Sequence, residues 1–137
     1  MHPIDRNVFY HAHSSGGVWK TEDAGQYWVP ITDGQINVGS VGAIAVSQSE
    51  PDVIYIGTGE PQLRDCVSWG DGVYKSTDGG DTWNHVGLKE TRNISRVRIH
   101  PKDPNRVYVA AIGNPFGLSK ARGIYRSRDG GQTWKQI

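Results

Sequence analysis

One short segment occurs three times along the chain, and this repeat constrains the fold more than any other feature of the sequence. Each copy runs from a glycine to a tryptophan: Gly17–Trp28, Gly72–Trp83 and Gly123–Trp134. Their shared aspartates, Asp23, Asp78 and Asp129, lie 55 and then 51 residues apart. Ahead of the later two copies, the stretch 44–55 matches the stretch 97–108 with a constant offset of 53 residues. A period near 50 residues indicates one supersecondary unit used repeatedly.

Each unit contains short runs of β-branched and aromatic residues separated by Gly, Pro, Asn, Asp and Ser, which predicts strands joined by turns. The second and third units contain four runs, lettered A to D below, whereas the first contains only B, C and D. The predicted runs are 7–12, 17–21 and 27–31, then 43–47, 53–57, 72–76 and 82–86, then 95–100, 106–112, 123–127 and 133–137. No window has the apolar spacing of an amphipathic helix.

These units predict an all-β fold: β-propeller blades of four antiparallel strands with Asp-box hairpins between C and D, about 2.75 blades in this chain. We expect a single partial propeller domain over residues 1–137, with units at 7–36, 41–90 and 95–137.

The residues between runs C and D explain why this turn is repeated. An aspartate at the start of a turn accepts backbone N–H groups, and a glycine two residues later adopts positive φ without steric cost. The tryptophan then begins strand D with a large ring that can pack between strands or blades. We therefore expect structural roles, and not catalytic ones, for the following residues: Asp23, Asp78, Gly80, Trp83, Asp129, Gly131 and Trp134.

Two of these turns, 76–83 and 127–134, match the Asp-box pattern Ser-x-Asp-x-Gly-x-Thr-Trp in full, and 21–28 is a degenerate copy. Together with the stretches 15–20, 56–60, 69–75 and 100–104, they make the chain resemble the BNR/Asp-box propeller proteins, most closely the sortilin-type bacterial members. The resemblance covers residues 8–137. It implies the fold specifically but the activity weakly, because such propellers include sialidases, xyloglucan-cleaving endoglucanases and sorting receptors. It also implies a closed ring, of which more than half is missing here.

In such a ring the A–B and C–D turns lie on one face, and the B–C and D–A loops lie on the other face around the central channel. The B–C loops differ in length, and variable loops on a fixed scaffold usually carry function. The loop 59–71 is the richest in reactive side chains. Because glycoside hydrolysis requires two carboxyl groups, its candidate catalytic residues are Glu60, Asp65 and Asp71, and its candidate ligand contacts are Arg64 and Trp69. The alternative is a self-packed loop in which Arg64 pairs with a neighbouring carboxylate.

Two enzyme activities of similar propellers can be tested on the residues. The sialidases carry an Arg-Ile-Pro tripeptide near the first strand, and this sequence contains none. The xyloglucan-cleaving relatives carry a catalytic Asp in a Thr-Asp-Ile-Gly-Gly-Ala-Tyr-like segment. The matching stretch here is 13–19, in which Ser14 replaces the carboxylate. Neither resemblance therefore supplies a catalytic set.

The histidines raise the question of a metal site. His11 and His13 alternate on one face of the first strand B, and His100 is a possible third ligand. Two histidines at i and i+2 without a fixed third ligand more often face solvent or make hydrogen bonds than bind zinc. We therefore expect no metal and no cofactor.

The charge balance argues against nucleic acid and against an acidic membrane surface as partners. Fifteen Lys and Arg residues accompany fourteen Asp and Glu residues, for a formal charge of +1. Apolar stretches such as 53–56 have strand length, far below the roughly 20 residues that span a bilayer, so we expect a soluble protein. The N-terminus lacks the layout of a secretion signal, and the single Cys66 says little about compartment. An extracellular or periplasmic location is expected only if a signal peptide was removed.

The expected function is a non-catalytic binding or assembly module with a glycan or peptide ligand. The alternative is a carbohydrate-active glycoside hydrolase whose site is completed by further blades or by a partner chain. Because both terminal blades would expose faces that a complete propeller buries, we also expect self-association as a homodimer or larger ring. The alternative partner is the remainder of a longer propeller.

Overall fold

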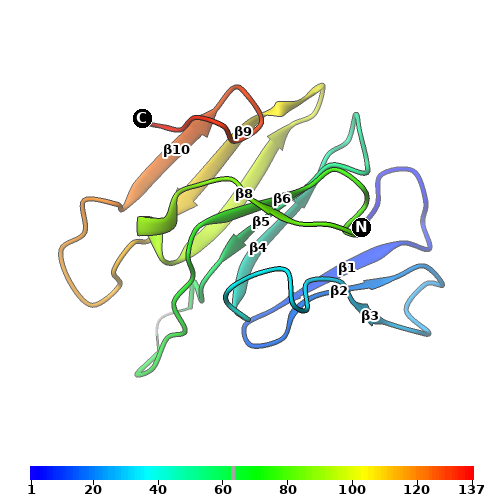
Figure 1. Ribbon diagram of the computed structural model, residues 1–137, viewed down its shortest axis with the longest axis horizontal. Coiled ribbons are helices and arrows are strands. Elements are labelled where there is room, and N and C mark those ends of the chain that lie inside the picture. The colour runs from blue at the N-terminus through cyan, green and yellow to red at the C-terminus, as the bar shows by residue number, and fades with distance from the viewer. Residues whose placement is uncertain (63) are drawn as a thin grey trace.

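The computed structural model describes residues 1–62 and 64–137 as three antiparallel sheets set side by side (Figure 1). The first sheet contains β1 (Phe9–His13), β2 (Gly17–Thr21) and β3 (Val29–Pro30). The second contains β4 (Val41–Val46), β5 (Ile54–Thr58), β6 (Val73–Ser76) and β7 (Asn84–His85). The third contains β8 (Ile94–His100), β9 (Asp103–Ala111), β10 (Gly123–Ser127) and β11 (Lys135–Gln136).

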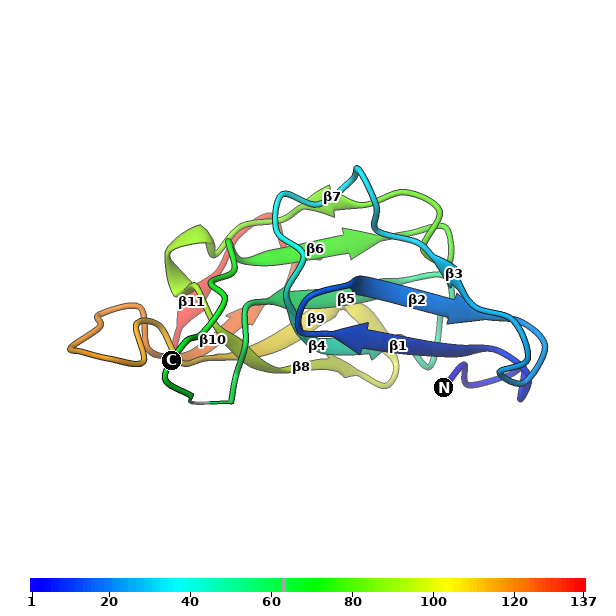
Figure 2. The same cartoon turned by 90° about the horizontal axis from the view of Figure 1, so that it is seen from below.

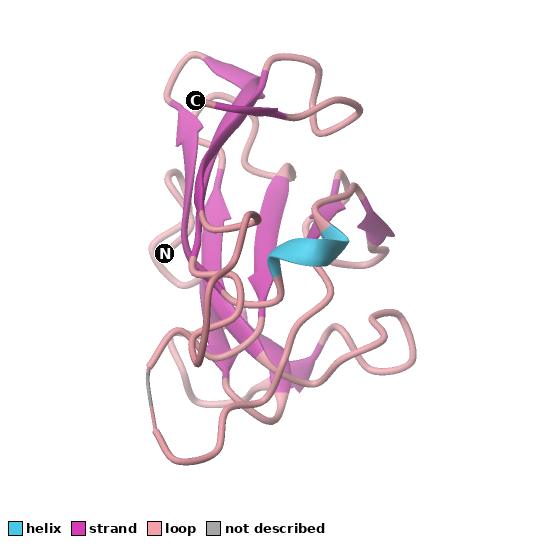
Figure 3. Ribbon diagram, turned by 90° about the vertical axis from the view of Figure 1, so that its left-hand side faces the viewer, coloured by secondary structure: helices cyan, strands magenta, loops and turns pink. Residues whose placement is uncertain are grey.

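The all-β prediction is confirmed, with the strands of each sheet arranged as an up-and-down meander. The 3-10 turn η1 (Lys89–Thr91) connects the second sheet to the third (Figure 3). Strands β4–β7 and β8–β11 are the predicted runs A to D, and the first sheet has only B, C and D. The three D strands are two residues long, shorter than predicted, because the residues ahead of them belong to the Asp-box turn. No helix in the described ranges is long and apolar enough to cross a membrane.

Figure 2 shows the strands of the three sheets from a second direction. Apolar side chains fill the two spaces between neighbouring sheets. Between the first and second sheets lie Val18, Val41, Ile54, Ile56, Tyr74 and Trp83. Between the second and third lie Ala43, Val53, Tyr55, Val73, Ile94, Val97, Val107 and Val109. Successive residues of β5 therefore face opposite neighbours, because side chains alternate across a strand. β5 has a neighbouring sheet on both faces, which explains why all of its residues, Ile54–Thr58, are buried.

The Asp-box tryptophans join each sheet to the one before it. The indole N–H of Trp83 donates to the carbonyl of Ile31 at 2.8 Å, and that of Trp134 donates to the carbonyl of Val86 at 2.7 Å. The glycine of the turn permits this approach: at Gly80, φ is +99° and an added Cβ would lie 2.6 Å from Cδ1 of Ile31. Glycine is thus required at this position both by its conformation and by the neighbouring sheet.

A hydrogen-bond network holds the Asp-box turn itself. In the second copy, the Asp78 carboxylate accepts the Ser76 hydroxyl at 2.7 Å and both the N–H and the hydroxyl of Thr82. The Ser76 hydroxyl in turn accepts the Gly80 N–H at 2.9 Å. The third copy repeats every contact with Ser127, Asp129, Gly131 and Thr133.

The first copy explains why its motif is degenerate. Asp23 accepts the backbone N–H groups of Gln26 and Tyr27, each at 2.9 Å. Tyr27 stands where Thr82 stands in the second copy, so the hydroxyl donor that Thr82 supplies there is replaced by the N–H of Gln26. Ala24 takes the positive φ, 61°, that Gly79 takes at 70° in the second copy. The turn therefore keeps its shape, with three hydrogen bonds to its aspartate carboxylate as in the second copy, although alanine is a less favourable residue than glycine at a positive φ.

Replacement of Asp78 by alanine is expected to lower the free energy of unfolding by about 1–3 kcal/mol, because the turn N–H and hydroxyl groups lose their acceptor. Asp81→Ala in the same turn is the matched control, since it removes a carboxylate that the contacts above do not use. Chemical denaturation of both variants measures the difference. Equal stability of Asp78→Ala and Asp81→Ala would contradict the structural role of this aspartate.

The same contacts predict how stability depends on pH. Hydrogen bonds from Thr82 lower the pKa of Asp78 from its ordinary value of 3.8 to about 2, and those from Thr133 do the same for Asp129. A carboxylate with a lowered pKa in the folded state stabilises fully above its unfolded-state pKa and loses that effect as pH falls through the folded-state value. Thermal midpoints of the parent and of the Asp78→Asn, Asp129→Asn double variant should therefore converge between pH about 4 and about 2. A gap that stays constant over this range would refute the assignment.

Candidate functional site

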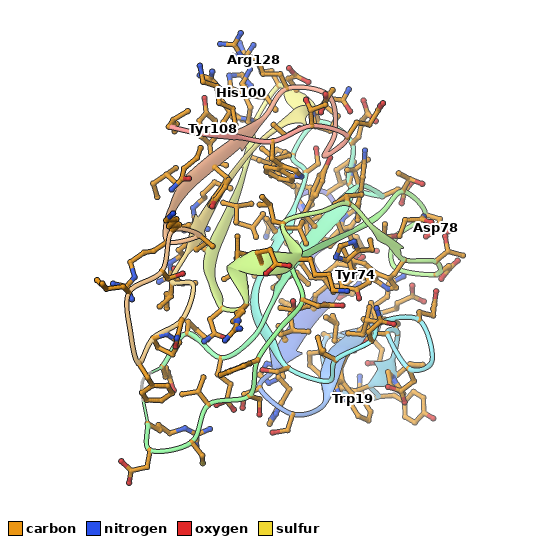
Figure 4. The ribbon with its side chains drawn as sticks, turned by 60° about the vertical axis from the view of Figure 1, so that its left-hand side comes forward. Trp19, Tyr74, Asp78, His100, Tyr108 and Arg128 are labelled. Carbon is orange, nitrogen blue, oxygen red and sulfur yellow. The ribbon has the colours of Figure 1, made fainter. Side chains whose placement is uncertain are left out.

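The turns and loops separate onto two sides of the molecule, as their hydrogen bonds show. On one side, each Asp-box turn bonds to an A–B turn, as when the Gly79 N–H donates to the Asp52 carbonyl at 3.0 Å. On the other side, the B–C loops bond to the segments that lead into strand A, as when the Gly70 N–H donates to the Arg92 carbonyl at 2.7 Å. The loop 59–71 therefore lies on the side opposite Asp78, which Figure 4 shows at the periphery of the molecule.

A cleft of about 300 Å³ opens on this loop side. Its walls are the end of β1 and the following turn (residues 11–14), the start of β4 (Val41 and Gly42) and the β5–β6 loop. From that loop come Glu60, Pro61, Gln62 and Arg64. The cleft thus lies between the first and second sheets.

Glu60 is the buried acid of the cleft, with 5% of its surface exposed. One carboxylate oxygen lies 2.8 Å from the Arg64 guanidinium, and the other accepts the Ser68 N–H at 3.2 Å. The hydrogen bond from Arg64 is the main reason that the pKa of Glu60 lies below its ordinary value. Glu60 is therefore an ionised anchor that closes the loop on itself.

Asp71 lies at the other end of the loop and organises its base. Its carboxylate accepts the Tyr74 hydroxyl at 2.7 Å and the Asn37 side-chain amide at 3.1 Å. Its backbone N–H donates to the Thr58 hydroxyl at 2.8 Å. Burial, with a further contribution from Asp71, raises the pKa of Tyr74 to about 12. Figure 4 shows Tyr74 well inside the molecule, so Asp71 connects the loop to the interior.

Trp69 and Arg92 pack against each other on this side. The Arg92 guanidinium carbon lies 4.0 Å from the centre of the Trp69 ring, a cation–π distance. Half of the Trp69 surface is exposed. Arg92 also lines a second hollow, of about 340 Å³, with residues of the β9–β10 loop. Sequence reasoning missed Arg92, because it follows η1 and is distant in sequence from the loop that it supports.

The predicted site residues thus divide into two groups in the structure. Arg64 and Glu60 form an ion pair, whereas Asp71 bonds to Tyr74, Asn37 and Thr58. Asp65 is exposed. A general acid in glycoside hydrolysis has a raised pKa, and the pKa of Glu60 shifts in the opposite direction.

The histidines lie in two places. The rings of His11 and His13 are 5.4 Å apart on β1, and His11 also packs edge-on against Trp28. His100 ends β8, and Figure 4 shows it at the opposite end of the molecule from Trp19. Within residues 1–62 and 64–137, no group of three or more His, Cys, Asp or Glu side chains is placed to hold a metal ion.

Several known proteins are similar to this chain over nearly its whole length. A xyloglucanase from Paenibacillus sp. is 28% identical over 148 residues, which cover 97% of this chain and 13% of that protein. A xyloglucanase from Hypocrea jecorina (strain QM6a) is 26% identical over 153 residues, covering 100% of this chain and 17% of that protein. The chain therefore spans less than a fifth of the length of these relatives.

Solved structures show the same arrangement of blades. An ancestral GH74 enzyme superposes with a TM-score of 0.74 at 25% identity, covering 100% of this chain and 17% of that one. A structure described as YCF48 bound to D1 peptide superposes with a TM-score of 0.66 at 18% identity, covering 97% of this chain and 38% of that one. The second similarity concerns the fold alone.

The three sheets are consequently blades of a β-propeller, and they match one part of the length of GH74 enzymes. The family model described as Sortilin-Vps10 (sortilin, neurotensin receptor 3) matches residues 16–137, which include all three Asp-box turns. This chain belongs to the Sortilin-Vps10 family of Asp-box β-propellers.

Proposed function

We propose that this chain is a glycan-binding segment of a β-propeller, and that its loop side contributes binding contacts and no catalytic acid or base. The observation that carries the proposal is the half-exposed Trp69 ring, which Arg92 contacts at 4.0 Å, on the loop that also holds the Glu60–Arg64 ion pair. An aromatic ring fixed at one face offers its other face for stacking, and neighbouring charged groups can bond to sugar hydroxyls. The names of the relatives, which are xyloglucanases, favour a carbohydrate over a peptide.

Two features support a binding role over catalysis. The Arg64 guanidinium lowers the pKa of Glu60 and so favours its ionised form, which disfavours a role as proton donor. In addition, Ser14 lines the cleft at the position where the xyloglucan-cleaving resemblance places an aspartate. A serine hydroxyl cannot replace an ionised carboxylate as a general base at neutral pH.

The second candidate function is glycoside hydrolysis by a larger assembly to which this chain contributes one wall. The names of the relatives favour this alternative, because they belong to enzymes of which the chain matches less than a fifth. In that case the catalytic carboxylates would come from other blades, either of a longer polypeptide or of an associated chain. Self-association as a homodimer or larger ring remains a proposal of the same kind.

Isothermal titration calorimetry with a xyloglucan oligosaccharide tests the proposal. Trp69→Ala should weaken binding about three- to tenfold, because a stacked aromatic ring contributes roughly 0.5–1.5 kcal/mol beyond its buried area. Tyr27→Ala is the matched control: Tyr27 is a well-exposed aromatic residue on the Asp-box side, so its removal should leave the affinity unchanged.

Two results would contradict the proposal. Equal losses for Trp69→Ala and Tyr27→Ala would show that Trp69 is not the contact. Release of reducing sugar by the parent that disappears in Asp71→Asn, while the circular dichroism spectrum stays unchanged, would assign catalysis to this segment.

A further inference from the structure

A groove of about 410 Å³ lies beside the first two Asp-box turns, and we call it the Asp-box groove. One wall comes from β2, β3, the turn between them and Ile31. The other wall comes from Asp81 in the second Asp-box turn. Both walls belong to neighbouring sheets whose strand pairing the structure describes, so the groove is a feature of the junction between these two sheets.

Contacts across this junction hold the two walls in place. The Gln35 side-chain amide donates to the Asp81 carbonyl at 3.0 Å, and its oxygen accepts the Trp83 N–H at 3.1 Å. Ile31 packs against the apolar residues between the first and second sheets. The backbone of Asp81 is therefore fixed against the first sheet, while the residue itself stays exposed.

The junction of the second and third sheets offers a comparison within the same chain. In the Asp-box groove, two apolar residues and two carboxylates stand where the second junction has uncharged polar residues. The equivalent pairs, at offsets of 55 and 51 residues, are Tyr27 and Thr82, Val29 and Asn84, Glu22 and Thr77, and Asp81 and Gln132. Tyr27 is 72% exposed and Val29 is 47% exposed. Neighbouring apolar residues that remain exposed indicate an interaction site.

The residue at position 27 also changes the aspartate of its turn. In the second copy, the Thr82 hydroxyl donates to Oδ2 of Asp78. In the first copy, all three donors of the turn bond to Oδ1 of Asp23. Oδ2 of Asp23 accepts no hydrogen bond from any residue that the structure describes. The same substitution therefore adds an exposed ring and leaves a carboxylate oxygen available at the groove.

The charges of the groove favour a cationic ligand. The ammonium group of Lys20 lies 2.7 Å from the Glu22 carboxylate, so these two charges compensate each other. Asp23 and Asp81 form no ion pair within residues 1–62 and 64–137. A guanidinium group can stack on a tyrosine ring and donate hydrogen bonds to carboxylates at the same time. The groove therefore matches an arginine side chain with an apolar neighbour.

We propose that the Asp-box groove binds an arginine-containing segment of a partner protein, with the guanidinium stacked on Tyr27 and bonded to Oδ2 of Asp23 and to Asp81. The next apolar side chain of the segment packs on Val29. The groove lies on the side opposite the loop 59–71. This inference therefore does not rest on glycan binding and concerns a different partner.

An acetylated and amidated peptide with the sequence Ala-Leu-Arg-Leu-Ala is the direct probe. It is titrated into the full ¹⁵N-labelled chain, and the backbone amide signals of Tyr27, Val29 and Asp81 should shift. The concentration dependence of these shifts gives the dissociation constant. The matched control peptide carries citrulline, which has nearly the same shape as arginine but no charge. It should bind about fivefold more weakly, because charged hydrogen bonds and the cation–π contact are lost.

Variants of the chain use the residues of the second junction, which the fold already accepts at equivalent positions. Tyr27→Thr removes the ring and supplies a hydroxyl to Asp23, and Asp81→Gln removes the carboxylate. Each should weaken binding of the arginine peptide about three- to fivefold. Glu50→Gln removes an exposed carboxylate from the β4–β5 turn on the same side. This control should leave the dissociation constant unchanged.

Several results would overturn the proposal. Equal binding of the arginine and citrulline peptides would show that the groove does not recognise the charge. Equal constants for the parent, Tyr27→Thr and Asp81→Gln would place the contact elsewhere, as would the absence of shifts at millimolar peptide. A loss in Glu50→Gln as large as in Asp81→Gln would reduce the effect to general attraction between charges. Shifts of the same amides with a xyloglucan oligosaccharide, and none with the peptide, would assign the groove to a glycan.

Discussion

The structure depends on a hydrogen bond that crosses from one blade to the next. The indole N–H groups of Trp83 and Trp134 each donate to a carbonyl of the preceding blade, at Ile31 and Val86. The donor begins the D segment of its blade, and the acceptor ends the D segment of the blade before it. The hydrogen bonds within the Asp-box turn fix the position of the tryptophan ring that follows it. A local motif therefore determines the contact between blades. Burying a polar N–H between apolar sheets requires such an acceptor.

This coupling explains which parts of the fold were predictable from the sequence. The Asp-box turns and the runs of β-branched residues depend on local chemistry, so the strands and their order followed from the repeats. The short D strands were not predicted, because Thr82 has strand-like composition but bonds to Asp78 and stays in the turn. The hydrogen bond from Trp83 to the Ile31 carbonyl could not be predicted either, because a sequence repeat does not identify which carbonyl a side chain contacts in the folded chain.

The candidate site was predictable in composition but not in geometry. The loop 59–71 was expected from its polar and aromatic residues, and its ends do hold Glu60 and Asp71. Their hydrogen-bond partners, which the sequence did not identify, are Ser68 for Glu60 and Tyr74, Asn37 and Thr58 for Asp71. Arg92 was missed because its contact with Trp69 joins the second blade to the segment that leads into the third.

Hydrogen exchange of the five indole N–H groups, measured by NMR, tests the coupling between blades most directly. The account predicts slow exchange for Trp83 and Trp134, whose N–H groups bond to the preceding blade. It predicts fast exchange for Trp69, which stands half exposed on the loop side. Exchange of Trp83 and Trp134 as fast as that of Trp69 would contradict the claim that these bonds hold the blades together.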